Sequence, residues 1–406
     1  MTRKLTNRRR LLAGAAATVA IGAPAIVRAQ GGGLKVGVLL PRTGFEAFFG
    51  QDCQHGVDLA PPIFKTLGLP DLTIMSGDTE SNVDVAREHA EKLIGEGAQL
   101  LIGAFDSGQT VAVAQVAEQK GIPFVVNIAG APEITEQGYK FVFRNFPTVG
   151  MTLNDSFAEQ KEIFTIAGVA PKTAVFMHVN DTFGTAMAKG IGGIMPKYDL
   201  PYKIAEEIAY DPTARDLSVE VAKAKATNPE ILLVVSRLND AMMITRELVK
   251  QRWTPQAILS LGPGWGENQY LKTLGNFSDG PIGFNPWPDP NKKLTAVLAA
   301  ALAKAHPDLN LNTLQTFTFE ALLIAADAYK RAGSTDPKVL ADAIRATNIT
   351  DNVAIGGGIQ FNAKGQNDKV GIGANQNRAG KNLVLAPKSA ANAKPEWPMM
   401  PYQNRT

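Results

Sequence analysis

Residues 100–110 read LLIGAFDSGQT, and this stretch decides the fold. Its first three residues form an apolar run that is typical of a buried strand. A helical pattern follows at residues 110–120 and is closed by Gly121, a residue that favours helix C-termini. A strand that enters a helix through a short glycine-containing loop is the building unit of parallel α/β sheets. The stretch therefore predicts a parallel sheet with helices on both faces.

The same alternation of strand and helix occurs in two separate runs. The first run has expected strands at 35–40, 72–75, 100–102 and 124–126, and the second has them at 174–179, 204–209, 231–235 and 257–261. Helical patterns lie between these strands, at 110–120, 185–195, 215–226 and 241–251 among others. Two runs predict an α/β protein with two doubly wound, Rossmann-like lobes. The late helices expected at 294–305, 314–332 and 338–347 have few strands between them, so we expect them to return and cover the first lobe.

Three segments are candidates for the chain crossings between the lobes. They are residues 146–150, the proline-rich residues 281–290 and the glycine-containing residues 353–365. These positions predict a first lobe of residues 34–147 plus 283–353 and a second lobe of residues 148–282 plus 354–406. We expect the tail from residue 386 onward to lie extended over the surface.

The first 29 residues have the pattern of an export signal. Arg8 and Arg9 belong to a positive N-terminal region, an alanine-rich apolar segment follows, and Val27 and Ala29 form a small-residue cleavage site. The paired arginines before two leucines resemble a twin-arginine signal, and an ordinary secretory signal is the alternative. We expect cleavage near Ala29 and a location in the periplasm. The single Cys53 cannot form an internal disulfide, so the core alone must hold the fold there.

Removal of the signal changes the charge of the protein. The signal carries six of the 41 basic residues and no acidic ones, which leaves 35 Lys and Arg against 38 Asp and Glu, a net charge of −3. A slightly acidic mature chain has no electrostatic basis for binding nucleic acid.

The loop of residues 103–110 is the strongest candidate for a binding site. A helix N-terminus favours an anion through its free N–H groups and its dipole, and Ser107 adds a hydroxyl donor. Gln109 stands where a phosphate loop requires lysine, which argues against nucleotide binding. The four histidines are scattered without metal-ligand spacing, and a nucleophile–base pair is not recognisable. We therefore expect neither catalysis, nor a metal, nor a cofactor.

An ordered set of short motifs resembles a known family. The motifs in this set are Leu-Pro-x-x-Gly at 40–44, the loop at 103–110, APEIT at 131–135, FRN at 143–145, NDTFG at 180–184 and GIQFNAKGQ at 358–366. The set is similar to the type I periplasmic solute-binding proteins of branched-chain amino acid ABC importers. This resemblance implies two lobes joined by three crossings, a small-molecule ligand in the cleft and a membrane permease as partner. It also implies that Ser107 and its neighbouring backbone hold a ligand carboxylate and that Phe183 contacts the ligand. We expect the protein to be a monomer.

Two departures from the family bear on the ligand. Gly130 stands where the amino-acid binders have a threonine for the α-ammonium, and Gly264 stands where they have a glutamate, although Glu267 is close enough to replace it. A desolvated ammonium without a carboxylate is costly. We therefore hypothesise a hydrophobic or aromatic acid without an α-amino group. The expected ligand-binding residues are Arg42, Phe45, Phe105, Asp106, Ser107, Ile128, Ala129, Gly130, Phe183, Arg237 and Trp265, of which Arg42, Arg237 and Trp265 equally suit surface or packing roles.

Three alternative functions stay open on the sequence. An ordinary leucine, isoleucine and valine binder would use Glu267 for the ammonium. A sensor that presents its ligand to a membrane receptor would have the same fold. An exported hydrolase would need a catalytic pair that the sequence does not reveal.

Overall fold

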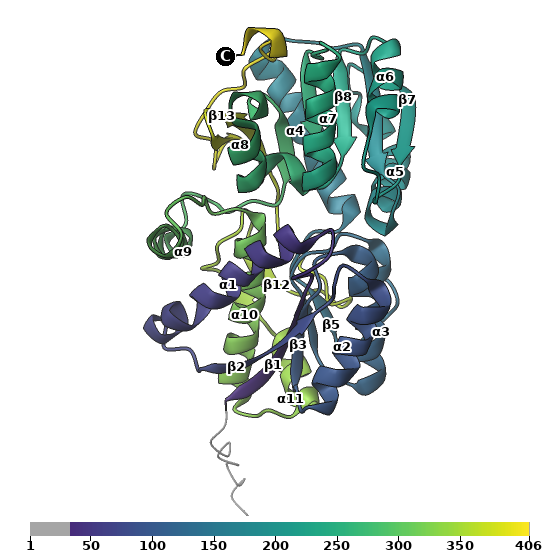
Figure 1. Cartoon of the computed structure of the whole chain (residues 1–406). Coiled ribbons are helices and arrows are strands. Elements are labelled where there is room, and N and C mark those ends of the chain that lie inside the picture. Colours follow the sequence, from purple (N-terminus) through teal and green to yellow (C-terminus); the bar gives the residue numbers. More distant parts are fainter. Residues whose placement is uncertain (1–32, 406) are drawn as a thin grey trace, which may run out of the picture.

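The computed structural model describes residues 33–405, and the expected export signal lies outside this range. The chain forms two α/β lobes, one above the other in Figure 1, with the chain passing between them. Each lobe is built around its own sheet. The predicted fold class is confirmed.

The first lobe holds a five-stranded parallel sheet in the order β2-β1-β3-β4-β5. The strands are β1 (Leu34–Leu40), β2 (Leu72–Asp78), β3 (Leu100–Gly103), β4 (Phe124–Val126) and β5 (Val142–Arg144). Its helices are α1 (Ala47–Thr66), α2 (Val83–Gly95), α3 (Ser107–Lys120), α9 (Lys293–Ala305), α10 (Thr313–Ala332) and α11 (Pro337–Arg345). The late helix α10 packs against α1, β3 and β4, which confirms the expected return to this lobe.

The second lobe holds a seven-stranded sheet in the order β14-β13-β10-β9-β8-β6-β7. Its strands are β6 (Thr173–Val179), β7 (Lys203–Tyr210), β8 (Ile231–Val235), β9 (Ala257–Ser260), β10 (Ile282–Asn285), β13 (Gly373–Arg378) and β14 (Lys381–Ala386). Its helices are α4 (Val149–Ala167), α5 (Thr182–Ile194), α6 (Ser218–Ala226), α7 (Leu238–Lys250) and α8 (Asn268–Leu274). Strands β6 to β10 run parallel to one another. Strands β13 and β14 are antiparallel additions that the sequence analysis missed.

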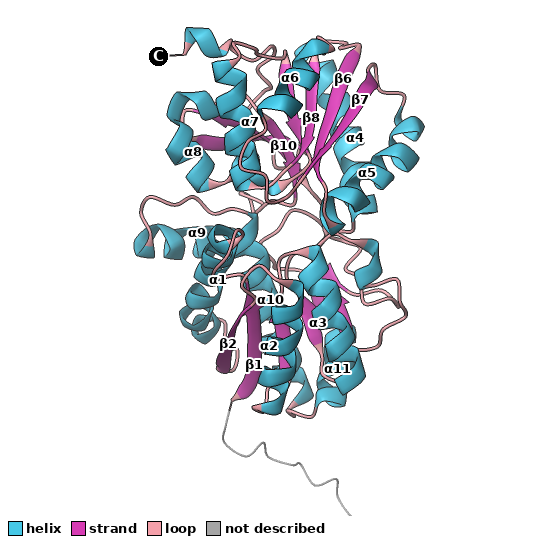
Figure 2. Cartoon of the chain, turned by 45° about the vertical axis from the view of Figure 1, so that its right-hand side comes forward, coloured by secondary structure: helices cyan, strands magenta, loops and turns pink. Residues whose placement is uncertain are grey.

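The side chains of successive residues in the central strands point to opposite faces of each sheet. In β6, Val175 and Met177 belong to the core that includes α6 and α7, and Ala174 and Phe176 belong to the core that includes α4 and α5. A strand that is buried on both faces must be apolar at every position, which is why these strands appear in the sequence as continuous apolar runs. Figure 2 shows the helices on both sides of the upper sheet.

Two of the predicted crossings need correction. Residues 282–285 are strand β10 of the second sheet, so the second crossing starts only at Pro286. In the third segment, β12 (Ile359–Gln360) pairs with β11 (Asn348–Ile349), and Gln366 bridges to Arg144 of β5. The chain therefore joins the second sheet only at Gly373, later than the predicted range of 354–406 implies. Prolines and glycines mark these segments, but tertiary pairing decides where each strand begins.

The tail is also more ordered than expected. Met399 and Tyr402 are buried against the second lobe, and Tyr402 lies within a short 3-10 helix, Tyr402–Asn404. Within residues 33–405, none of the helices is both long enough and apolar enough to cross a membrane.

Candidate functional site

A narrow, mainly apolar cavity lies between the lobes at the ends of β3, β4, β9 and β10. The residues that line it are Phe105, Asp106, Ser107, Ile128, Ala129, Gly130, Phe146, Val149, Thr152, Phe183, Met187, Arg237, Leu261, Pro263, Asn285, Pro286, Thr313 and Leu314. Both lobes and two crossings contribute to this list. The position, beyond the carboxyl ends of parallel strands, is the one expected for a ligand in this fold class.

Eight of the eleven predicted residues line the cavity: Phe105, Asp106, Ser107, Ile128, Ala129, Gly130, Phe183 and Arg237. Their contact with a ligand stays a prediction. Phe146, Asn285 and Leu314 also line the cavity and were missed. They lie on or beside the crossings, and the sequence did not indicate which side chains of those segments turn inward.

Arg42 and Phe45 are not in the cavity wall. The Arg42 guanidinium donates to Gln54 Oε1 at 2.7 and 3.1 Å and to the Gly77 carbonyl at 2.6 Å, so it is used within the first lobe. Phe45 is 47% exposed and lines a separate, more polar hollow at the mouth of the cleft. Both residues were predicted from their loop alone, but the loop directs Arg42 to the first lobe and leaves Phe45 exposed.

Trp265 has a packing role. It is buried, its indole N–H donates to Ser236 Oγ at 2.6 Å, and its ring packs at 5.3 Å from that of Tyr270. This satisfies the one polar group of the side chain inside the second lobe. The packing alternative stated for Trp265 is the one that the structure favours.

The N-terminus of α3 is partly capped by the protein itself. Asp106 is the N-cap residue, and its Oδ1 accepts from the N–H groups of Gly108 and Gln109 at 2.8 and 3.2 Å. The expectation that these N–H groups are free for an anion is therefore wrong. Ser107 is buried at the cavity, and its Oγ accepts from the Ala131 N–H at 3.4 Å, which leaves the hydroxyl hydrogen available to a ligand.

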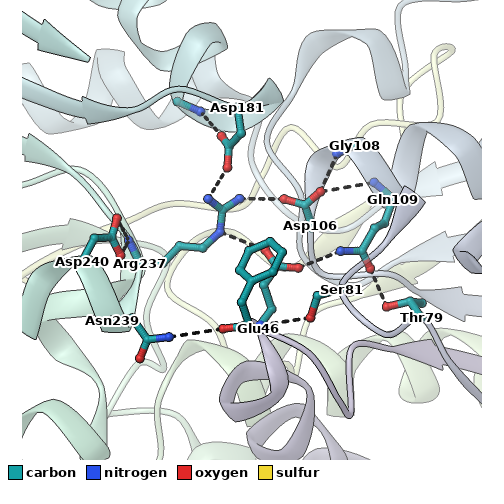
Figure 3. Close-up of polar contacts among 12 residues, drawn as sticks. Glu46, Thr79, Ser81, Asp106, Gly108, Gln109, Asp181, Arg237, Asn239 and Asp240 are labelled. Atoms are coloured by element: carbon teal, nitrogen blue, oxygen red, sulfur yellow. Dashed lines mark hydrogen bonds and ion pairs between the residues drawn. The ribbon is translucent and has the colours of Figure 1, made fainter. Parts of the chain in front are cut away.

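Arg237 crosses the cleft and binds carboxylates of both lobes. Its guanidinium pairs with Asp106 at 2.6 Å and Glu46 at 3.1 Å in the first lobe, and with Asp181 in its own lobe. Figure 3 shows the guanidinium surrounded by these three side chains. The Phe183 ring lies 5.8 Å from the guanidinium carbon. These three acidic side chains occupy the N–H groups of the guanidinium, so Arg237 is better placed to join the lobes than to anchor an anion.

Glu46 is a functional candidate that the sequence analysis missed. It is almost fully buried directly before α1, and its Oε2 accepts from Gln109 Nε2 at 2.6 Å. Burial, and next the negative charge of Asp106, raises the pKa of Glu46 to about 8. The signal that could have found it is its place just after the Leu-Pro-x-x-Gly motif at 40–44, which follows the end of a predicted strand.

Glu267 does not face the cavity. It is buried and accepts from Asn312 Nδ2 at 2.9 Å, and the same amide donates to Asp52 at 2.8 Å. Burial, and then the charge of Asp52, raises the pKa of Glu267 well above its usual range. This carboxyl links the lobes beside the cavity, so it is not positioned to hold a ligand ammonium.

Gly130 and Gly264 differ in what a side chain would meet. A Cβ at Gly264 would lie 2.2 Å from the Arg237 carbonyl oxygen, so this backbone cannot carry a glutamate there. A Cβ at Gly130 would make ordinary contacts with Val149 and Phe183, at 3.4 and 3.9 Å. The departure at Gly264 is thus required by the backbone, whereas the departure at Gly130 leaves space for a side chain.

Two doubly wound lobes, three connecting segments and a cavity between them define a two-lobed solute-binding protein. The chain belongs to the family described as Periplasmic binding protein, which it matches over residues 33–373. Among curated relatives, a Leu/Ile/Val-binding protein homolog 8 from Brucella suis is 24% identical over 407 aligned residues, covering 95% of this chain and 98% of the relative.

Solved structures of the same fold include type I periplasmic binding proteins. A leucine-binding protein LivK from Thermotoga maritima superposes with a TM-score of 0.76 at 21% identity, over 87% of this chain and 98% of its own. A solute-binding protein of an R. palustris ABC transporter, in complex with benzoate, gives 0.74 at 21% identity over 90% and 99%. LivJ from Streptococcus pneumoniae, in complex with isoleucine, gives 0.74 at 17% identity over 88% and 100%. At these identities the likeness establishes the fold and leaves the ligand open.

Proposed function

We propose that this protein is the extracytoplasmic receptor of an ABC importer and that it captures a small hydrophobic or aromatic carboxylate for a membrane permease. Closure of the two lobes over the ligand would create the surface that the permease recognises. The expected export signal at residues 1–29 supports a location in the periplasm.

One observation carries the proposal of an acid. The polar groups that remain unused at the apolar cavity include hydrogen-bond donors on adjacent loops, the Ser107 hydroxyl and the Gly130 N–H. Within residues 33–405, the Gly130 N–H has no acceptor among the protein's own groups. Such donors suit a carboxylate, since a buried anion must be hydrogen-bonded.

The site also supports a ligand that lacks an α-amino group. Asp106 is the only carboxylate in the described cavity wall, and it is already bound to Arg237 and to the start of α3. Gly264 has no room for a side chain, and Glu267 lies outside the cavity. An ammonium would have to be desolvated without a free carboxylate. The structure thus gives the branched-chain amino acid alternative less support than the sequence did.

Calorimetry with residues 30–406 tests the ligand class. The panel pairs benzoate and 4-methylpentanoate with leucine and isoleucine, at equal ionic strength. We expect the amine-free acids to bind and the amino acids to bind more weakly or not at all. Tight binding of leucine with no binding of either acid would overturn the proposed ligand class. It would support the alternative that the protein binds branched-chain amino acids.

The Ser107→Ala variant tests the proposed anchor. Loss of one hydrogen bond to a charged group costs about 1.5–3 kcal/mol, which corresponds to a roughly ten- to hundredfold loss of affinity for the acid. Ser278→Ala is the matched control, because Ser278 is also buried but donates to the Gly275 carbonyl in the second lobe. Unchanged affinity in Ser107→Ala would remove the carboxylate role from this serine.

A further inference from the structure

Arg144 lies directly behind the cavity wall, at the end of β5. Its side chain is fully buried, and it reaches the loop that carries Ile128, Ala129 and Gly130. Burying a guanidinium is expensive, and proteins normally compensate it with a carboxylate. A buried arginine therefore needs an explanation when it has no such partner.

Within residues 33–405, the hydrogen-bond acceptors of the Arg144 side chain are all neutral. Nε donates to Gln366 Oε1 at 2.6 Å, Nη1 to the carbonyls of Ala129 and Ala131 at 3.3 and 2.7 Å, and Nη2 to Thr135 Oγ1 at 2.7 Å. Within the described chain, no carboxylate oxygen lies within 4 Å of the guanidinium. The contrast with Arg237 is clear, since Arg237 pairs with three carboxylates.

The charge of Arg144 persists at neutral pH. Burial lowers the pKa of Arg144 to about 9, and the distant carboxylates of Glu133 and Glu136 partly oppose this change. The guanidinium therefore remains a cation under ordinary conditions. It is a positive charge in a low-dielectric interior, where charges act over longer distances than in water.

The peptide between Ala129 and Gly130 connects this charge to the cavity. Its carbonyl oxygen accepts from Arg144, and it is a trans peptide. In a trans peptide the N–H points opposite to the carbonyl, so the Gly130 N–H points away from Arg144. Gly130 lines the cavity. The guanidinium thus polarises a peptide whose positive end is directed to the ligand side of the loop.

The same side chain ties the loop to the crossings. Gln366, which accepts from Arg144, donates through Nε2 to the carbonyl of Phe146 at 2.9 Å. Phe146 follows β5 in the first crossing and lines the cavity, and Gln366 precedes the return to the second sheet. The loop is therefore held rigidly against two of the three connections, which keeps the polarised peptide in place.

We propose that Arg144 is a positioning residue that gives the cavity its preference for anionic ligands, acting through the Ala129–Gly130 peptide without touching the ligand. This inference rests on the proposed function, because it requires that a carboxylate binds in the cavity. It assigns the charge that favours anions to Arg144, since the guanidinium of Arg237 already contacts three acidic side chains.

The test compares an acid with its neutral amide. Calorimetry measures the affinities of benzoate and benzamide, and of 4-methylpentanoate and 4-methylpentanamide, for wild type and for Arg144→Gln. The variant loses the charge, and its shorter side chain keeps an N–H donor at about the position of Nε, beside Gln366. We expect the ratio of acid affinity to amide affinity to fall by about tenfold, because only the charged acid loses an electrostatic attraction when the guanidinium is removed. A loop that is merely disordered would weaken both ligands equally.

Further variants separate charge from structure. Arg144→Lys keeps the charge and should retain most of the ratio, even if both affinities fall. Gln366→Glu keeps Arg144 but places a carboxylate beside Nε, so it should lower the ratio as Arg144→Gln does, and it serves if Arg144→Gln does not fold. Arg345→Met is the matched control, since Arg345 also donates to a backbone carbonyl, that of Lys140, but lies on the outer side of Phe143.

The outcomes distinguish the two proposals. Wild-type protein that binds neither acid contradicts the proposed function and this inference with it. Wild-type protein that prefers the acids, together with an unchanged ratio in both Arg144→Gln and Gln366→Glu, overturns only the role of Arg144.

Discussion

At the scale of single residues, the cleft is decided by which polar groups are already used. Asp106 and Arg237 satisfy each other across the cleft, whereas Ser107 still has a hydroxyl hydrogen to offer. Residue type alone does not reveal this, because an arginine in a loop suits an anion site and an interlobe ion pair equally well. The expected anchoring role of Arg237 was reasonable from the sequence, but three carboxylates come to it from distant segments.

A glycine substitution tests the close approach at residue 264. Gly264→Ala should destabilise the protein by about 1–3 kcal/mol or more, because the new Cβ would lie 2.2 Å from the Arg237 carbonyl oxygen. Urea unfolding measures the change. Gly193→Ala is the control: its Cβ would meet nothing within 4 Å, and it lies inside α5. There we expect a gain of about 0.5–1 kcal/mol. Equal effects would contradict the packing argument.

At the scale of elements, the amphipathic and apolar patterns located most helices and strands. The strand expected at 231–235 coincides with β8, and the helix expected at 314–332 differs from α10 by one residue at its start. The pattern failed at β10, because Ile282–Asn285 is a four-residue strand between prolines that looked like a linker. It also missed β13, whose GANQNR sequence has few apolar residues. These strands form because a neighbouring strand is present, and a local pattern does not contain that information.

Helix α10 offers a test of how one cap can connect two lobes. Asn312 caps α10 by accepting from the Leu314 N–H at 2.8 Å, and its amide donates to Asp52 and Glu267. Asn312→Ala should cost about 1 kcal/mol for the cap and about 1–3 kcal/mol more for the two buried carboxyl groups that lose a donor. Urea unfolding gives the value.

Asp336→Ala is the matched control for that cap. Asp336 caps α11 through the N–H groups of Lys338 and Val339, at 3.0 and 3.1 Å, and it makes no contact between the lobes. We expect this variant to lose only about 1 kcal/mol. If both variants lose the same amount, the amide contacts of Asn312 contribute nothing measurable.

At the scale of the whole molecule, the two lobes meet through buried acidic groups with few cations. Glu46 and Glu267 lie on opposite lobes, and burial raises the pKa of both. Burial disfavours the ionised form of both carboxyl groups, and separation of the lobes would favour their ionisation. The stability of the contact between the lobes therefore depends on pH.

The pH dependence of stability follows from Glu46. Its pKa rises from 4.5 to about 8 on folding, mainly by burial. Between these values the folded protein keeps a proton that the unfolded chain loses, so its contribution is complete below about pH 4.5 and is lost as the pH rises to about 8. We expect the melting temperature of Glu46→Gln, relative to wild type, to increase across this window and then level off.

A second buried carboxyl provides the control for this pH profile. Burial, and then the charges of Asp155 and Glu162, raises the pKa of Glu159 to about 9. Glu159 lies in α4, within the second lobe. Glu159→Gln should therefore show the same trend over a window that extends to about pH 9. A difference between Glu46→Gln and wild type that stays constant from pH 5 to pH 9 would contradict the assignment for Glu46.

Local patterns in the amino-acid sequence were sufficient to predict the fold class, the number of lobes and the loops around the cavity. These follow from local patterns, since an apolar run or a helical period survives without knowledge of the rest of the chain. The sequence also indicated eight of the residues in the cavity wall, because the ends of parallel strands must lie at one edge of a sheet. Only the tertiary structure decided the partners: Arg237 with Glu46, Glu267 with Asn312, and Arg144 with Gln366. Those pairs join residues 45 to 222 positions apart, and their energies depend on burial and charge that exist only after folding.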